Sequence, residues 1–443
     1  MIDVERLQEL KKDIYKCIHC KACRFAYSGE PMRKGIGEHA GKQGKVLYEG
    51  MVQACPAGLE FGWEAYWNAG KVWIARAVLE GDLELDEEVR DVALRCITCG
   101  MCGSQCENKV PTVDIIEALR AALVEAGVPL IDVHATVTRL AEELNNPYGG
   151  KPEERTKWAK DAGLERWLNK DAKIAYFIGC TASYRQTNIA VATCKILEKL
   201  GYDFTVVGDE VCCGSPFFRI GKIDTAKKLV EKNMETFKKY EQVIFSCAGC
   251  YRTFTVDYPK WTKEELPFKT KHAIEIVAEK VKDGTVKLKE SPELKGKVVT
   301  YHDPCHLGRH FGLEFERELI QQSKNLMFDM RKLGAKLEEW FEIPRSILRA
   351  IPGITFREMY RIKMDSMCCG AGGGVRAGFP EFSLKTASRR LDEANAIAAD
   401  IVTTECPFCW RNLTDANEQY GHGLQVYGIL ELLEKFDLID VKK

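Results

Sequence analysis

The grouping of the cysteines constrains this 443-residue chain more than any other feature of the sequence. All but one of the nineteen cysteines stand in groups with short, repeated spacing. Many cysteines indicate disulfides in a small exported domain, but this chain is long and its start, MIDVERLQELKK, lacks the apolar stretch of a signal peptide. The grouping therefore favours metal ligation. The remaining Cys194 lies in the apolar helical stretch IAVATCKILEKL and is predicted to be a core residue.

Two groups in the N-terminal part have the spacing of 4Fe–4S ligands. One group has the pattern C-x2-C-x2-C-x3-C and comprises Cys96, Cys99, Cys102 and Cys106. The other repeats the first three positions, with Cys17, Cys20 and Cys23, and the next cysteine is Cys55. In two-cluster ferredoxins the fourth cysteine of a run ligates the other cluster. We therefore expect two cubane clusters, one held by Cys17, Cys20, Cys23 and Cys106 and the other by Cys96, Cys99, Cys102 and Cys55.

Structural zinc is the alternative interpretation of this region, because paired C-x2-C motifs also suit a tetrahedral ion. Zinc sites rarely use three cysteines at two-residue gaps, and a set of eight thiolates matches two cubanes better. Two clusters that exchange ligands also lie close enough to exchange electrons. The region is therefore predicted to conduct electrons.

Hydrophobic periodicity separates a helical part of the chain from an α/β part. Residues 1–125 are predicted to be helix-rich, with Thr112 as the N-cap of a helix whose apolar face carries Ile115, Ile116, Leu119 and Leu123. Residues 126–171, which include the turn sequence NNPYGG, are predicted to be a linker. From residue 172 onward, apolar runs alternate with helical segments: KIAYFIG, DFTVVG, QVIFS, KVVTYH, ITFREMY and DIVTTE. This alternation predicts α/β units with largely parallel sheets, and an α+β multidomain fold for the whole chain.

The second part of the chain also repeats itself. The first copy contains Cys180, Cys212, Cys213, Cys247 and Cys250, and the second contains Cys305, Cys368, Cys369, Cys406 and Cys409. The copies match once an insertion of about thirty residues is allowed in the second. We therefore predict one α/β domain over residues 172–290 and another over residues 296–443, with the insertion at about 313–342. Because apolar runs precede the cysteines, we expect each group to converge at the carboxyl ends of its strands.

The motifs of this repeat resemble a known family. The segments VCCGSPFFRIG and SCAGCYRTF, and then YHDPCHLGRH, CCGAGGGV and ECPFCWRN, are similar to the two CCG domains of the heterodisulfide reductase family. The resemblance covers nearly the whole chain, since the catalytic subunit of the membrane-linked reductase also joins two N-terminal 4Fe–4S sites to two CCG domains. It implies a helical ferredoxin-like domain followed by two CCG domains.

The resemblance further implies that each five-cysteine group is catalytic and binds a noncubane 4Fe–4S cluster. One cluster would be held by Cys180, Cys212, Cys213, Cys247 and Cys250, and the other by Cys305, Cys368, Cys369, Cys406 and Cys409. The implied oxidoreductase passes electrons through the two cubanes to the two noncubane clusters, which reduce a disulfide. That disulfide is the heterodisulfide of coenzyme M and coenzyme B, or a disulfide or trisulfide on a small carrier protein.

A second function within the same resemblance is an electron relay without disulfide chemistry. The relay would connect a flavoprotein dehydrogenase or electron-transfer flavoprotein with menaquinone. The long gap from Cys23 to Cys55, and the run GLEFGWEAYWNAGKVWIARAVLEG after it, resemble this relay-type group. Either function implies redox partners, namely a membrane subunit with haem b or quinone, or a flavoprotein.

Composition limits the other classes of partner. A net charge of −1 and 29% charged residues argue against a nucleic-acid-binding protein. A run of about 18 apolar residues, the length that a membrane span needs, is absent from the sequence. We therefore expect a cytoplasmic protein that reaches the inner face of a membrane through a partner subunit.

Several further residues are candidates for contact with the clusters. Backbone N–H groups of Gly370 and of residues 372–374 could approach cluster sulfides or an anionic substrate. His302 and His306 flank Cys305, and either a hydrogen-bonding role or a plain core role fits them. The arginines that follow the cysteine motifs could neutralise cluster charge, with ordinary salt bridges as the alternative: Arg219, Arg309 and Arg376.

The insertion after Cys305 has two interpretations. Its periodicity favours amphipathic helices that pack on their own domain. It also carries Met327, Trp340 and Phe341 among charged residues, and these could form a docking surface.

Overall fold

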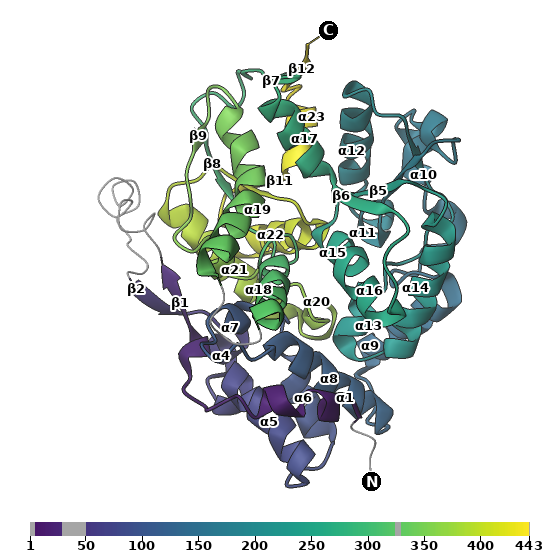
Figure 1. The fold of residues 1–443 in the computed structure, drawn as a ribbon. Helices are drawn as coiled ribbons and strands as arrows, with labels where there is room; N and C mark the ends of the chain where they lie inside the picture. The colour runs from purple at the N-terminus through teal and green to yellow at the C-terminus, as the bar shows by residue number, and fades with distance from the viewer. Residues whose placement is uncertain (1–4, 29–49, 324–328, 443) are drawn as a thin grey trace.

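Short helices form the N-terminal part of the protein. The computed structural model describes residues 5–28, 50–323 and 329–442. Strands β1 (Phe25–Ser28) and β2 (Gly50–Gln53) pair antiparallel at one side of this part (Figure 1). Its helices are α1 (Glu5–Glu9), α2 (Lys11–Ile14), α4 (Pro56–Phe61), α5 (Asn68–Glu80), α6 (Glu87–Leu94), α7 (Met101–Ser104) and α8 (Thr112–Glu125).

Helix α8 lies at the centre of these helices. It packs against α1, α5 and α6, and its predicted apolar residues Ile115, Ile116, Leu119 and Leu123 are all buried. The prediction that Thr112 caps this helix is wrong. The helix begins at Thr112 itself, after Pro111, and the Thr112 hydroxyl lies 3.0 Å from the Cys102 sulfur. A side chain turned towards Cys102 cannot also accept the hydrogen bonds of the first helical turn.

The segment between the helical and the α/β parts contains helices of its own. Helix α9 spans Asp132–Leu144, and the shorter α10 spans Lys157–Asp161. Asn145 ends α9 in the left-handed conformation that asparagine tolerates. The Asn146 side chain then holds the turn by donating to the carbonyls of Leu144 and Gly150. This segment therefore runs as a packed helical connection.

The first α/β half is built on a four-stranded parallel sheet in the order β4–β3–β5–β6. Its strands are β3 (Ile174–Phe177), β4 (Phe204–Val206), β5 (Gln242–Phe245) and β6 (Lys269–His272). Its helices are α11 (Cys180–Tyr184), α12 (Thr187–Lys199), α13 (Ser215–Ile220), α14 (Ile223–Phe237), α15 (Ala248–Arg252), α16 (Tyr258–Thr262) and α17 (Ala273–Lys282).

The second half repeats this order as β9–β8–β10–β11. Its strands are β8 (Val298–Tyr301), β9 (Thr355–Phe356), β10 (Ile401–Thr404) and β11 (Gln425–Gly428). Its helices are α18 (Arg309–Ser323), α19 (Met330–Ala350), α20 (Val375–Gly378), α21 (Pro380–Ala396), α22 (Pro407–Tyr420) and α23 (Ile429–Lys435). The prediction of parallel α/β units is confirmed, and all six predicted apolar runs contain a strand.

The two halves stand side by side above the N-terminal helices (Figure 1). Helix α12 packs against α23, and α17 packs against α19, so that one hydrophobic core extends across both halves. Strands β7 (Val286–Leu288) and β12 (Ile439–Val441) pair antiparallel and tie the C-terminal strand to the connection between the halves. Within residues 5–28, 50–323 and 329–442, no helix has the length and apolarity needed to cross a membrane.

The predicted insertion forms a pair of helices, α18 and α19, that contact each other. Phe341 is buried, and the Trp340 ring contacts Phe311 and Phe315 of α18 at centroid distances of 6.0 and 5.9 Å. Met327 lies outside the described residues. The two aromatic residues that are described therefore pack within their own domain, as the first interpretation predicts.

Candidate functional site

The first group of N-terminal cysteines surrounds one pocket. Three of the cysteines follow α2 and the fourth follows α7, and the pocket is lined by Cys17, Cys20, Cys23 and Cys106 together with Asn68 and Val110. Cys20 is exposed, whereas Cys23 is buried. The grouping agrees with the predicted exchange of the fourth ligand, because Cys106 comes from the other run.

The second group forms around Cys55, which lies directly before Pro56, the first residue of α4. Burial raises the pKa of the Cys55 thiol to about 11, and the cysteine neighbours that add most to this shift are Cys96 and Cys99. A metal would therefore have to displace a proton from this thiol on binding. Cys102 in turn lies near Cys96 and Cys99.

Two buried cations fit an anionic cluster at this second group. Lys71 is 1% exposed, and the anionic groups that most favour its charge are the thiols of Cys55, Cys96 and Cys102. Arg120, also 1% exposed, donates hydrogen bonds to the carbonyl oxygens of Ala93 and Cys96. A buried cation requires a nearby negative charge. Four thiolates around an iron–sulfur cluster meet that requirement better than four neutral thiols.

In the first α/β half, five thiols lie at the carboxyl ends of the strands, as predicted. Cys180 follows β3, the adjacent pair follows β4, and Cys247 follows β5. Side-chain contacts join the thiols in one series: Cys180 with Cys212, Cys212 with Cys213, Cys213 with Cys250, and Cys250 with Cys247. All five are buried.

The second half repeats the arrangement. Contacts join Cys305 with Cys368, Cys368 with Cys369, Cys369 with Cys409, and Cys409 with Cys406. Cys305 is partly exposed and the other four are buried. Five converging thiols exceed what one tetrahedral ion can bind, so the donor set fits a cluster with several metal atoms.

Two further contacts, which sequence reasoning missed, connect the groups. The Cys247 thiol contacts the Cys406 thiol, so the two five-cysteine groups meet. The Cys99 thiol contacts Cys368, so the second N-terminal group meets the second five-cysteine group. Every step from Cys99 to the five-cysteine groups is therefore a contact between sulfur atoms.

The histidines near Cys305 have different surroundings. His302 lies with Cys369 and Cys409, and its potential ligand nitrogen is within 4.8 Å of both sulfurs. His306 forms a similar set with Cys305 and His310. Burial lowers the pKa of His306 to about 4. His306 is therefore a neutral hydrogen-bonding group in this site.

The candidate arginines have separate roles. Arg219 forms buried ion pairs with Glu117 and Asp257, and Arg376 pairs with Asp415. Arg309 donates to the carbonyl oxygens of Cys99 and Ser366, and so joins two cysteine loops. The salt-bridge interpretation holds for the first two, while Arg309 binds backbone carbonyls beside the cysteines.

Sequence reasoning missed a buried ion pair at the first five-cysteine group. Arg155 donates to Glu210 at 2.9 Å and lies 3.5 Å from the Cys180 sulfur. Glu210 accepts the backbone N–H groups of Ile178 and Gly179. This pair holds the turn from β3 to Cys180. Arg155 stands far from any cysteine in the sequence, so no local pattern could have identified it.

The glycine-rich loop makes a close contact different from the predicted one. A Cβ atom on Gly372 would lie 2.8 Å from the carbonyl oxygen of Ile97, and one on Gly373 would lie 2.6 Å from that of Cys96. His134 of α9 approaches Gly374 from the other side, with its Nε2 atom 2.9 Å from the Gly374 carbonyl oxygen. These glycines therefore allow the loop that follows Cys369 to pack directly on the loop of the N-terminal cysteines.

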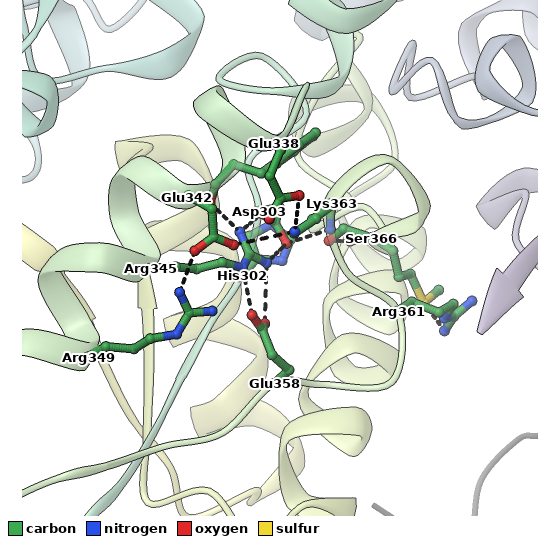
Figure 2. A network of polar contacts seen from close by, with 12 residues as sticks. His302, Asp303, Glu338, Glu342, Arg345, Arg349, Glu358, Arg361, Lys363 and Ser366 are labelled. Atoms are coloured by element: carbon green, nitrogen blue, oxygen red, sulfur yellow. Dashed lines mark hydrogen bonds and ion pairs between the residues drawn. The ribbon is translucent and has the colours of Figure 1, made fainter. Parts of the chain in front are cut away.

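A polar network anchors the insertion to the second five-cysteine group (Figure 2). Arg345 of α19 is fully buried and donates to both carboxylate oxygens of Asp303, two residues before Cys305. It also donates to Glu358 at 2.6 Å. The backbone N–H of Lys363 donates to Asp303, and the Lys363 side chain pairs with Glu338. The network links α19 to the chain on the N-terminal side of both Cys305 and Cys368.

Comparisons with known proteins agree with these cysteine groups. A 4Fe–4S dicluster domain matches residues 12–110, and a cysteine-rich domain matches residues 174–255 and 299–414. The iron–sulfur subunit of this type in dihydromethanophenazine:CoB–CoM heterodisulfide reductase from Methanosarcina acetivorans is 37% identical over 381 residues. That match covers 84% of this chain and 85% of the relative.

Other relatives carry different names. A fumarate reductase (CoM/CoB) subunit from Methanothermobacter marburgensis is 33% identical, over 76% of this chain and 60% of that protein. An EtfAB:quinone oxidoreductase from Syntrophomonas wolfei is 27% identical, over 77% of this chain and 46% of that protein. All three names describe redox proteins, but they differ in substrate.

Proposed function

Since the chain belongs to the heterodisulfide reductase family of iron–sulfur subunits and is an oxidoreductase, we propose that it reduces a disulfide between its two five-cysteine groups. The contact between Cys247 and Cys406 carries this proposal. A disulfide has two sulfur atoms, and a substrate placed at this junction would present one sulfur to each group. The substrate is CoM-S-S-CoB, or a disulfide or trisulfide carried by a small protein.

The proposed cofactors are two cubane and two noncubane 4Fe–4S clusters. The eight N-terminal cysteines hold the cubanes as two sets: Cys17, Cys20, Cys23 and Cys106, and then Cys55, Cys96, Cys99 and Cys102. The ten cysteines of the α/β halves hold the noncubane clusters. We assign residues 1–125 to the cubanes, 172–290 to the first noncubane site and 296–443 to the second, with 126–171 as the connection.

The reaction requires two electrons and two protons. The S–S bond breaks, each sulfur gains one electron, and both leave as thiols after protonation. When bound, the clusters supply electrons singly and offer iron to each released sulfur. The chain's own residues position the two groups: Arg155 holds the turn at Cys180, and Arg345 holds the loop at Cys305.

The electrons must come from other redox subunits. We propose a membrane subunit with haem b or quinone, or a flavoprotein, as the donor. A membrane subunit would also hold the chain at the inner face of the membrane. Two of the relatives are named as single subunits of larger reductases, which supports an assembly of this kind.

The test is a count of iron and sulfide in the anaerobically purified protein, with EPR spectra of the oxidised protein recorded with and without coenzyme M and coenzyme B thiols. We expect about sixteen irons per chain, as four 4Fe–4S clusters require, and a signal that depends on thiol. Cys406→Ser should abolish the thiol-dependent signal, whereas Cys194→Ser, outside the groups, should retain it. About eight irons without a thiol response would refute disulfide reduction.

The electron relay is the second candidate function. The similarity to EtfAB:quinone oxidoreductase supports it. In this case electron-transfer flavoprotein would reduce the clusters, and menaquinone would accept the electrons through a partner. Reduction of the clusters by reduced electron-transfer flavoprotein, together with no thiol-dependent signal, would favour the relay.

A further inference from the structure

The first N-terminal group is the accessible end of the series of cysteines. Among the described cysteines, Cys20 alone is exposed, and nine of the ten in the five-cysteine groups are buried. A protein that delivers electrons can approach Cys20 closely without displacing other parts of the chain. The surface around the loop that carries Cys20 is therefore where a donor would be expected to bind.

Exposed apolar side chains gather around this loop. Ile18 is 70% exposed and Trp63 is 78% exposed, and Tyr15 and Trp73 are exposed at 41% and 39%. These are four of the seven large apolar side chains that are exposed in the described part of the chain. A contiguous exposed apolar patch with aromatic residues is typical of a protein interface.

Ring stacking and polar contacts connect these side chains into one surface, which we call the entry surface. The Trp73 ring stacks on His19 at 4.9 Å. The Arg76 guanidinium lies over both Tyr15, at 4.7 Å, and Trp73, at 5.1 Å. His19 in turn lies 3.0 Å from the carboxylate of Glu64, which directly follows Trp63 in the chain. Ile18 belongs to the same loop as His19.

The charge around the entry surface is positive. Its two carboxylates are already paired within the chain, Glu64 with Arg24 and Lys21, and Glu80 with Arg76. The surrounding basic residues lie on α2 and the cysteine loop: Lys11, Lys12, Lys16 and Lys21. Asp13 is the acidic residue among them and pairs with Lys16. A partner with acidic residues around an apolar centre would complement this surface.

We propose that the entry surface, formed by Tyr15, Ile18, Trp63 and Trp73 with the lysines of α2, docks an acidic one-electron carrier protein. This inference rests on the proposed function, because it assigns the place where that function receives its electrons. The carrier's acidic residues would pair with the α2 lysines while its apolar centre covers Ile18 and Trp63. One electron then passes from the carrier to the group containing Cys20, which oxidises the carrier and reduces the protein by one electron per encounter.

The test compares two reductants of the anaerobically purified holoprotein. One is a dithionite-reduced acidic two-cluster ferredoxin, and the other is reduced methyl viologen, a small cation that needs no docking surface. The variants are Lys12→Glu and Trp63→Ala. The matched controls are Lys239→Glu, at an exposed lysine of the first α/β half, and Tyr420→Ala, at an exposed aromatic residue of the second.

Each entry-surface variant should lower the second-order rate constant with ferredoxin by about tenfold at low salt and weaken its binding by a similar factor. High salt should reduce the wild-type rate towards that of Lys12→Glu, because screening removes the charge attraction. The viologen rate should stay within about twofold for all four variants. Binding measured by thermophoresis provides a readout independent of cluster reduction.

Two results would overturn the proposal. One is a ferredoxin that does not bind the wild-type protein, and the other is an equal effect of entry-surface and control variants. Neither bears on the proposed function, which the viologen-reduced protein tests by itself. If viologen reduces the clusters and the thiol-dependent signal is absent, disulfide reduction fails while the docking result still stands.

Discussion

Arg345 donates hydrogen bonds of 2.7 and 2.9 Å to the two carboxylate oxygens of Asp303, and both side chains are buried. The pair joins the inserted helix α19 to the loop that carries Cys305 (Figure 2). The insertion therefore acts as a support for the second five-cysteine group. A buried charge left without its partner is strongly unfavourable, so this support can be tested by removing one side of the pair.

Replacing Arg345 should release the Cys305 loop. We expect Arg345→Met to lower the free energy of unfolding by about 3–5 kcal/mol, because Asp303 would remain buried and unpaired. The variant should also lose iron from the second five-cysteine group. Arg349→Met, on the same helix but paired with Glu342 at the surface, should change stability by less than about 1 kcal/mol. Equal iron contents and equal thermal midpoints for the two variants would contradict this role.

The exchanged fourth ligand predicts which cysteine variants share a cluster. Cys20→Ser and Cys106→Ser should each remove about four irons, and the double variant should remove no more, since both belong to one cluster. Cys20→Ser combined with Cys55→Ser should remove about eight irons. Iron analysis and EPR of the reduced proteins measure the loss. If the Cys20/Cys106 pair loses about eight irons and the Cys20/Cys55 pair about four, each run keeps its own fourth cysteine.

Asp114 links three parts of the chain and should stabilise their arrangement. It pairs with Lys260 of the first α/β half and, at 2.7 Å, with Arg317 of α18. Burial alone would raise the pKa of Asp114, but these two cations hold it well below its usual value. A carboxyl with a lowered folded-state pKa stabilises the protein above its unfolded pKa of about 3.9, and this contribution disappears as the pH falls through the folded pKa.

Asp114→Asn should therefore lower the thermal midpoint by a constant amount between about pH 5 and pH 8, because both pKa values lie below that range. The loss of two charged hydrogen bonds corresponds to about 2 kcal/mol. Asp13→Asn, which removes an exposed pair with Lys16, should cost less than about 0.5 kcal/mol. A deficit in Asp114→Asn that changes steeply across this pH range would show that another group titrates.

The sequence was sufficient to predict local features of the site. Each cysteine run has a fixed spacing, and the apolar runs before Cys180, Cys247 and Cys406 identify strands, so convergence of the thiols follows from the geometry of parallel sheets. Strands β6, with the sequence KTKH, and β11, with QVYG, were not predicted. Both are edge strands, and their short, partly polar sequences lack the apolar run that identifies a buried strand.

The contacts between the cysteine groups could not be predicted from the sequence. The approach of Cys247 to Cys406 depends on how the two α/β halves pack, and that of Cys99 to Cys368 depends on the glycine-rich loop. Arg345 likewise appears in the sequence as one basic residue of an amphipathic helix. Its role arises only because α19 packs beside β8, which brings Arg345 to Asp303. Long-range packing, rather than local pattern, determines these features.

The close approach at Gly373 gives a prediction that separates backbone strain from contact. Gly373 has a φ of +63°, and a Cβ atom there would lie 2.6 Å from the carbonyl oxygen of Cys96. Gly423 has a φ of +73° but open space around it. Gly423→Ala should therefore cost only the left-handed conformation, about 1–2 kcal/mol. Gly373→Ala should cost more, because the loop must also move away from Cys96.

That movement should affect the contact between Cys99 and Cys368, which lies beside the same loops. We therefore expect Gly373→Ala to slow electron transfer from the N-terminal clusters to the five-cysteine groups, while Gly423→Ala leaves the rate unchanged. Rapid-freeze EPR after mixing with reduced methyl viologen measures the order in which the signals appear. Equal rates in the two variants would mean that the glycine-rich loop does not maintain the connection, and that electrons reach the five-cysteine groups by another route.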